Sequence, residues 1–201
     1  MNDKSVIFDL GNVLVFVNEF MLSRRILQVY DLNESFLYQK RDSLEAVAKE
    51  FDEGKISPEK FTERFARVLN VDIDVSQFKE MWSDMLTENV PAMNIVKELK
   101  GKARLLILSN INLWHFEYIR MNFDVLNHFD DLILSFELGY GKPDRRIFER
   151  AIECSRGSKQ ILYFDNIPEF VDEASKLGIH AYQYTGEDFL YRALINEGVL
   201  E

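Results

Sequence analysis

Short apolar runs bounded by turn residues recur along this chain and alternate with longer amphipathic stretches. The strand candidates are residues 6–8, 104–108, 132–136, 161–164 and 181–184. The helix candidates, with apolar side chains at three- and four-residue spacing, are residues 92–99, 113–121, 143–153 and 169–177. Pro143 is expected in the first turn of its helix, where a missing N–H costs nothing. The alternation predicts an α/β fold with a parallel sheet and helices on both faces.

The segment from residue 16 to residue 91 breaks this alternation and is too long for a loop. Its pattern predicts only helices, at residues 19–30, 34–51, 58–69 and 75–86. We therefore expect a helical insertion after the first strand, packed over the carboxyl edge of the sheet. Residues 1–16 and 91–201 would form the core and residues 17–90 the insertion, with linkers near 16–18 and 87–91.

Composition and charge limit the partners of this chain. It has 201 residues, of which 47% are hydrophobic, and a net charge of −10. Such a charge opposes binding to nucleic acid or to an anionic membrane, so we expect neither partner. The apolar runs are far shorter than a membrane span. The single cysteine, Cys154, fits a reducing compartment, and we expect the cytoplasm.

Polar residues that suit phosphate chemistry stand at or just beyond the predicted strand ends. They are Asp9, Ser109, Asn110, Lys142, Asp165 and Asn166. A carboxylate can attack phosphorus, a lysine supplies compact positive charge, and paired carboxylates hold Mg²⁺. Each residue alone is typical of a turn, a helix cap or a solvated loop. Because ligands of open α/β sheets bind at the carboxyl edge, their joint occurrence favours one site.

Four segments, in order, resemble the motifs of the haloacid dehalogenase-like hydrolase superfamily. They are Phe8-Asp9-Leu10-Gly11-Asn12-Val13-Leu14, Leu108-Ser109-Asn110, Gly141-Lys142-Pro143-Asp144 with Ile147-Phe148, and Tyr163-Phe164-Asp165-Asn166 with the following Glu173-Ala174 and Leu177-Gly178-Ile179. The turn Gly54-Lys55-Ile56-Ser57 followed by Phe61 is similar to one in the helical cap of that superfamily. The resemblance covers essentially the whole chain. It implies a Rossmann-like core with an all-helical cap, and a subgroup that resembles phosphatases of sugar 1-phosphates.

The resemblance also implies a role for each matching residue. Asp9 would be the nucleophile, and Lys142 would balance the charge between Asp9 and the phosphoryl group. The phosphoryl group would be bound by Ser109, Asn110, Gly11 and Asn12. Mg²⁺ would be held by Asp9, the backbone carbonyl of Gly11, Asp165 and Asn166. The partner would be a small phosphorylated metabolite, and the protein a monomer or a homodimer.

Two positions depart from the superfamily pattern. Most of its phosphatases carry a second aspartate, which protonates the leaving oxygen, where this chain has Gly11. General acid catalysis of this kind contributes about 10²–10⁴-fold in rate. A good leaving group such as an anomeric oxygen needs less protonation, which favours a sugar phosphate. Asn166 replaces one acid of the usual aspartate pair, so we expect weaker Mg²⁺ binding.

These departures leave three functions open. The favoured one is a Mg²⁺-dependent phosphatase that works through an aspartyl phosphate and is weakened by Gly11 and Asn166. The second is a metal-free 2-haloacid dehalogenase, which Asp165 disfavours because its charge would oppose a haloacid carboxylate. The third is a catalytically inactive binding module on the same fold. Trp114 and His115, just after Ser109 and Asn110, are the aromatic residues best placed to line the pocket.

Overall fold

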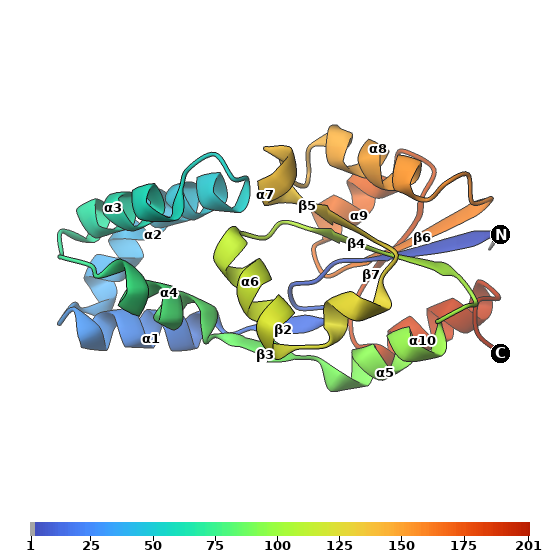
Figure 1. The fold of residues 1–201 in the computed structure, drawn as a ribbon, viewed down its shortest axis with the longest axis horizontal. Coiled ribbons are helices and arrows are strands. Elements are labelled where there is room, and N and C mark those ends of the chain that lie inside the picture. The colour runs from blue at the N-terminus through green and yellow to red at the C-terminus, as the bar shows by residue number, and fades with distance from the viewer. Residues whose placement is uncertain (1–2) are drawn as a thin grey trace.

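The computed structural model describes residues 3–201 and has a five-stranded parallel sheet at its centre (Figure 1). The strands are β1 (Lys4–Phe8), β4 (Arg104–Ser109), β5 (Asp131–Leu134), β6 (Gln160–Asp165) and β7 (His180–Gln183). Their order across the sheet is β5-β4-β1-β6-β7, and every neighbouring pair is parallel. The inner strands are apolar along their length because helices cover both faces.

Alternate residues of the inner strands feed two hydrophobic clusters on opposite faces of the sheet. The helices from residue 90 onward are α5 (Val90–Glu98), α6 (Leu113–Asn122), α7 (Ser135–Leu138), α8 (Arg145–Cys154), α9 (Pro168–Ser175) and α10 (Glu187–Asn196), with a short 3-10 helix, η1 (Val125–His128). Helices α8 and α9 cover one face, and α5 and α10 lie on the other (Figure 1). The predicted α/β fold with helices on both faces is confirmed. Within residues 3–201, no helix has the length and apolarity needed to cross a membrane.

A group of four helices is inserted between two short strands and lies at the end of the molecule opposite both termini (Figure 1). The helices are α1 (Glu19–Val29), α2 (Glu34–Asp52), α3 (Pro58–Leu69) and α4 (Val75–Ser83). Each begins after a side chain that caps its first backbone N–H groups, namely Asn18, Asn33, Ser57 and Asp74. We refer to these four helices as the cap.

The segments that join the cap to the core are strands rather than loose linkers. Strands β2 (Val15–Val17) and β3 (Leu86–Glu88) pair antiparallel, with Phe16 opposite Thr87. The helix expected at residues 75–86 therefore ends at Ser83, and the expectation that residues 16–91 form only helices was wrong. Each of these short strands forms because it pairs with a strand about seventy residues away in the chain. The periodicity of a local stretch of sequence does not indicate such a distant partner.

Two further boundaries differ from expectation. The strand expected at residues 132–136 ends at Leu134, because Ser135 begins the short helix α7. Pro143 does not open a helix: it follows a cis peptide bond from Lys142, and α8 begins at Arg145. The cap of α8 is Asp144, whose side chain accepts a hydrogen bond from the backbone N–H of Arg146 at 3.0 Å.

The interior of the cap is an aromatic cluster that includes one residue of the core. Phe51 and Phe61 stack with ring centroids 4.3 Å apart, and the cluster continues through Phe65, Phe78 and Trp82. Trp114 of α6 packs edge-on against Phe51 at 5.1 Å and is 2% exposed. Trp114 was expected to line the substrate pocket, but its ring completes the interior of the cap and borders a different hollow, between α1, α4 and α6. Helix α6 is thereby packed against the cap.

The cap also contacts the core where its second helix ends. Gly54, with a φ of +63°, lies against the backbone of Phe136 in α7. The hydroxyl of Ser135 donates a hydrogen bond to the backbone carbonyl of Asp52. Only glycine fits at position 54, because a Cβ atom there would collide with the carbonyl oxygen of Phe136.

Replacing Gly54 by alanine is expected to lower the free energy of unfolding by about 2–4 kcal/mol, from the left-handed backbone together with the steric clash. The control is Gly101→Ala, which has a φ of +81° and nothing within 4 Å of the added Cβ. We expect the control to lose only about 1–2 kcal/mol. Urea titration of both variants measures the difference, and equal losses would contradict a tight contact between the cap and α7.

Candidate active site

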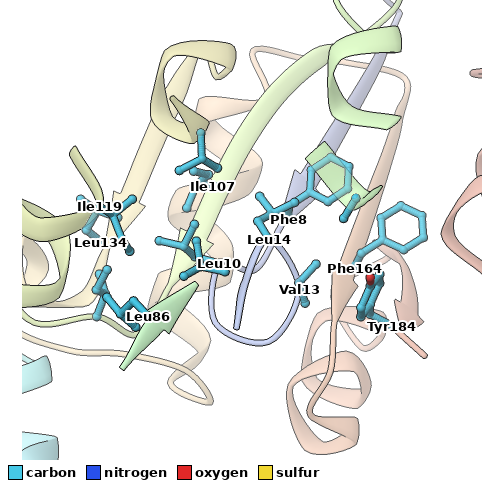
Figure 2. Packing of buried hydrophobic residues seen from close by; sticks show 14 of the residues in the cluster. Phe8, Leu10, Val13, Leu14, Leu86, Ile107, Ile119, Leu134, Phe164 and Tyr184 are labelled. Atoms are coloured by element: carbon cyan, nitrogen blue, oxygen red, sulfur yellow. The ribbon is translucent and has the colours of Figure 1, made fainter. Parts of the chain in front are cut away.

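The turn after β1 fixes Asp9 at the carboxyl edge of the sheet. The backbone N–H of Asp9 donates to the carbonyl of Phe164 at 2.9 Å, which extends the parallel pairing of β1 with β6 by one residue. The following turn is anchored by buried Leu10, Val13 and Leu14, which Figure 2 shows beside Phe8, Ile107 and Phe164. Because these buried side chains pack against the hydrophobic core, the turn holds the carboxylate of Asp9 in a fixed position.

Lys142 brings two buried carboxylates together. Its Nζ lies 2.8 Å from Oδ1 of Asp9 and 2.6 Å from Oδ2 of Asp165. The side chains of Lys142 and Asp165 are 1% and 0% exposed. The rings of Phe170 and Tyr163 pack around the ammonium group, with centroids 5.1 and 5.8 Å from Nζ. Three residues separated by up to 156 positions in the chain thus form one buried cluster, as the sequence predicted.

The loop that carries Lys142 is clamped by Asn110. The side chain of Asn110 accepts from the backbone N–H of Lys142 at 2.7 Å and donates to its carbonyl at 2.8 Å. Gly141 allows this approach, since a Cβ atom there would lie 2.5 Å from Oδ1 of Asn110. Asn110 is nevertheless exposed, so its amide still faces solvent at the mouth of the site.

The remaining predicted residues lie nearby in different settings. Ser109 is 2% exposed, and among residues 3–201 its hydroxyl makes only a long contact of 3.5 Å, with the carbonyl of Asn110, which leaves it available to another acceptor. The side-chain oxygen of Asn12 accepts from the backbone N–H of Val17 at 3.0 Å, so this side chain closes the turn. Asn166 is half-buried beside Asp165, and its carbonyl accepts from Gln183 at 3.3 Å.

Sequence reasoning assigned no role to Tyr163, which completes the environment of Asp165. The Tyr163 hydroxyl donates to Oδ2 of Asp165, and the backbone N–H of Ile167 donates to Oδ1 at 2.8 Å. The signal was present in the sequence, because residues two apart on a strand project from the same face. Burial and the nearby charges of Asp165 and Asp9 hold the pKa of Tyr163 well above its usual range, so the hydroxyl keeps its proton.

The charges of the buried cluster do not balance. Two carboxylates face one ammonium group, and the net charge of the three side chains is −1 when all are ionised. Burial raises the pKa of Asp9 to about 6, the charge of Lys142 opposes that rise, and the charge of Asp165 adds to it. One further positive charge beside Asp9 and Asp165 would therefore stabilise the ionised cluster.

The donors at this edge fit a hard cation. Mg²⁺ keeps several waters and needs only one or two carboxylates from a protein. Asp9 and Asp165 supply these carboxylates, and the residual negative charge favours a cation. No group of three His, Cys, Asp or Glu side chains with metal-binding geometry occurs in the described part of the chain. A cation here would be held by the two aspartates together with backbone or amide oxygens.

A cavity of about 730 Å³ separates the cap from this edge of the core. Asn12 and Asn110 line it on the core side, together with Asn112 and His115, and helices α1 and α2 line it on the cap side. His115 lines this cavity, as the sequence indicated, but both ring nitrogens are engaged. Nε2 lies 3.0 Å from the carbonyl of Trp82, and Nδ1 lies 3.3 Å from the amide of Asn112. Burial lowers the pKa of His115 to about 4, so the ring is neutral.

Comparison with known proteins agrees with this geometry. A family model of haloacid dehalogenase-like hydrolases matches residues 4–168. The chain therefore belongs to the haloacid dehalogenase-like hydrolase family and is an enzyme of the hydrolase class.

The individual proteins that this chain resembles share only about a fifth of its residues. A D-ribitol-5-phosphate phosphatase of Bacteroides thetaiotaomicron is 21% identical over 188 residues, which cover 90% of this chain and 91% of the relative. A solved enzyme of the same family from Bacteroides thetaiotaomicron, in complex with magnesium and inorganic phosphate, superposes with a TM-score of 0.81 at 22% identity, covering 92% of this chain and 96% of that one. An L-2-haloacid dehalogenase of Xanthobacter autotrophicus with chloropropionic acid covalently bound gives a TM-score of 0.66 at 18% identity, covering 98% of this chain and 84% of that one. The two structural likenesses show the fold.

Proposed function

We propose that this chain is a Mg²⁺-dependent phosphatase of a small phosphorylated metabolite, a sugar or polyol phosphate, and that it acts through an aspartyl phosphate on Asp9. The observation that carries the proposal is the buried cluster of Asp9, Lys142 and Asp165, with its residual negative charge, next to Asn110, which clamps Lys142 and lines the cavity. The D-ribitol-5-phosphate phosphatase among the relatives supports the substrate class. We also propose residues 1–16 and 91–201 as the core domain, residues 17–90 as the domain that contains the cap, and the cytoplasm as the compartment.

The chain's own residues would divide the reaction as follows. The carboxylate of Asp9 attacks phosphorus, the bond to the ester oxygen breaks, and the alcohol leaves. Ser109, Asn110 and the backbone at Gly11 and Asn12 hold the phosphoryl oxygens. Water then attacks the phosphorus of the acyl phosphate and releases phosphate, which regenerates Asp9.

Lys142 would neutralise part of the charge shared by Asp9 and the phosphoryl group during both steps. Bound Mg²⁺ would neutralise phosphoryl oxygens and help to orient them. The residues to hold it are Asp9, Asp165, the carbonyl of Gly11 and the amide oxygen of Asn166.

The test is a screen with and without Mg²⁺ over polyol phosphates, sugar phosphates, acyl phosphates, nucleotides and p-nitrophenyl phosphate, with chloroacetate as the comparison. We expect phosphate release that stops in EDTA and is fastest on a polyol or sugar phosphate. Chloride release without metal would replace the proposal by a dehalogenase. No turnover of any compound would favour a binding module.

Replacing Asn166 by aspartate is expected to tighten Mg²⁺ binding on the order of tenfold, because affinity for hard cations rises with the charge of the ligands. Isothermal titration calorimetry on metal-free protein measures the change. The control is Asn196→Asp, which adds the same charge at an exposed position at the end of α10. If both variants bind Mg²⁺ as the unmodified protein does, the side chain of residue 166 is not a ligand.

A further inference from the structure

The core of this active site offers no acid for the leaving oxygen. The position where most phosphatases of the family carry one is Gly11, and the carboxylates of Asp9 and Asp165 are already engaged by Lys142. His115 lines the cavity but uses both ring nitrogens within the protein. A phosphatase that releases an alcohol from this site therefore needs a proton from elsewhere in the cavity wall.

The cavity wall contains four carboxylates in the described part of the chain. They are Glu19, Glu34, Glu45 and Asp52. The three glutamates are exposed on α1 and α2. Asp52 differs from them because it is half-buried at the end of α2, the point at which the cap meets the core.

Asp52 is held toward the core by two contacts. Its Oδ1 accepts from the side-chain amide of Asn112 at 2.8 Å, and its backbone carbonyl accepts from Ser135. Asn112 is itself fixed as the cap of α6, where its oxygen accepts from the backbone N–H of His115 at 3.0 Å. Within residues 3–201, neither a hydrogen bond to Oδ2 nor an ion pair to Asp52 is present, so one carboxylate oxygen remains for a ligand in the cavity.

The position of Asp52 matches the path of a leaving group. Asn112 stands two residues after Asn110, and two residues of extended chain span at most about 7 Å. Asn110 and Asp52 also line the same cavity, so a substrate whose phosphoryl group meets Asn110 would extend its leaving group into the space that Asp52 borders. Because Asp9 would attack from the core side, an in-line displacement expels the alcohol toward the cap, where Asp52 lies.

Resting on the phosphatase function proposed above, we propose that Asp52 of the cap is the general acid and base of this site, in place of the acid that Gly11 lacks. As Asp9 bonds to phosphorus and the ester bond breaks, the proton of Asp52 passes to the leaving oxygen. In the second step the Asp52 carboxylate takes a proton from the attacking water. The bond between phosphorus and Asp9 then breaks, and both aspartates return to their starting states.

The local environment supports this assignment. Burial raises the pKa of Asp52 to about 6, the hydrogen bond from Asn112 opposes the rise, and the charge of Glu53 adds to it. Glu53 forms an ion pair with Lys55. The ring of His115 in α6, which shares Asn112 as a partner with Asp52, is neutral. A carboxyl group that titrates near neutral pH can donate a proton in one step and accept one in the next.

The test compares Asp52→Asn with the unmodified protein on phosphate esters graded from p-nitrophenol to simple alkyl alcohols. Release of the alcohol is measured in a single turnover, which isolates the first step. We expect alcohol release from alkyl esters to fall about 10²–10⁴-fold and release of p-nitrophenol to change little, since only poor leaving groups need the proton. The matched control is Asp42→Asn on the same helix, where the side chain is 91% exposed.

A second variant separates catalysis from damage to the fold. Position 11 has room for a side chain, because an added Cβ would meet only Cγ2 of Val17, at 3.8 Å. We expect Gly11→Asp combined with Asp52→Asn to restore alcohol release from alkyl esters. An equal loss on all esters, or no loss on any, would overturn the role of Asp52 and leave the phosphatase proposal intact. If the unmodified protein hydrolyses no ester, the phosphatase proposal fails and this assignment fails with it.

Discussion

Replacing Asp9 by asparagine is expected to abolish phosphate release, with a fall in kcat of roughly 10⁴-fold or more. The amide keeps the shape of the side chain but has no anionic oxygen to attack phosphorus, so the acyl phosphate does not form. The measurement is phosphate release under saturating substrate and Mg²⁺. Mass spectrometry of protein quenched during turnover should find phosphate on Asp9 in the unmodified chain and none in the variant.

The loss should occur in a folded protein. The buried cluster carries two carboxylates and one ammonium group, so removal of one negative charge relieves repulsion between Asp9 and Asp165. We therefore expect the melting temperature of metal-free Asp9→Asn to match or exceed that of the unmodified chain. Phosphate release that persists in a purified, folded variant would rule out Asp9 as the nucleophile.

The sequence predicted those parts of the site that follow from strand ends. Asp9 follows β1, and Ser109 and Asp165 end β4 and β6, so the parallel order of these strands is enough to bring the three residues together. Lys142 lies eight residues beyond the end of β5, in a loop with no regular geometry. Its place just beyond a predicted strand end and in a recognisable motif predicted that it would join the site, whereas its path to Asp9 depends on contacts such as the clamp from Asn110.

The parts that the sequence did not predict depend on how the cap meets the core. The contact between Asp52 and Asn112 joins residues 60 positions apart on elements that periodicity describes separately. Trp114 shows the same limit: its helix belongs to the core by sequence order, but its ring fills the interior of the cap. Apolar periodicity indicates which face of a helix is buried and does not indicate which neighbour covers it.

The shared aromatic interior has a consequence for the cap. Rotation of the cap away from the core would have to carry α6 along or expose the ring of Trp114, since that ring packs on Phe51 and Phe61. Burial of an aromatic side chain of this size contributes about 1.5–3 kcal/mol. We therefore expect α6 to move with the cap if the cavity opens, which would also displace Asn112 and its partner Asp52.

Replacing Lys142 by methionine is expected to lower the free energy of unfolding by about 3–5 kcal/mol in metal-free buffer, in addition to its effect on activity. The ammonium group is the positive charge that both buried carboxylates contact in the described structure. Methionine matches the length of the stem and suits the rings of Phe170 and Tyr163, so the cost comes from charge rather than from packing. For a chain of this size the melting temperature should fall on the order of 10 °C.

A second substitution distinguishes charge from shape at Lys142. If the loss arises from uncompensated carboxylates, adding Asp165→Asn to Lys142→Met should recover part of the stability, because one buried charge is removed. The deficit of Lys142→Met should also shrink as the pH falls from 8 to 5. Burial raises the pKa of Asp9 to about 6 although Lys142 opposes the rise, so without the lysine that pKa should be higher still, and protonation of Asp9 at acid pH removes the repulsion between the two carboxylates. If the loss of stability in Lys142→Met is independent of pH and unchanged by Asp165→Asn, Lys142 stabilises the fold through its contacts with the rings. The charges of the buried cluster would then contribute little to stability.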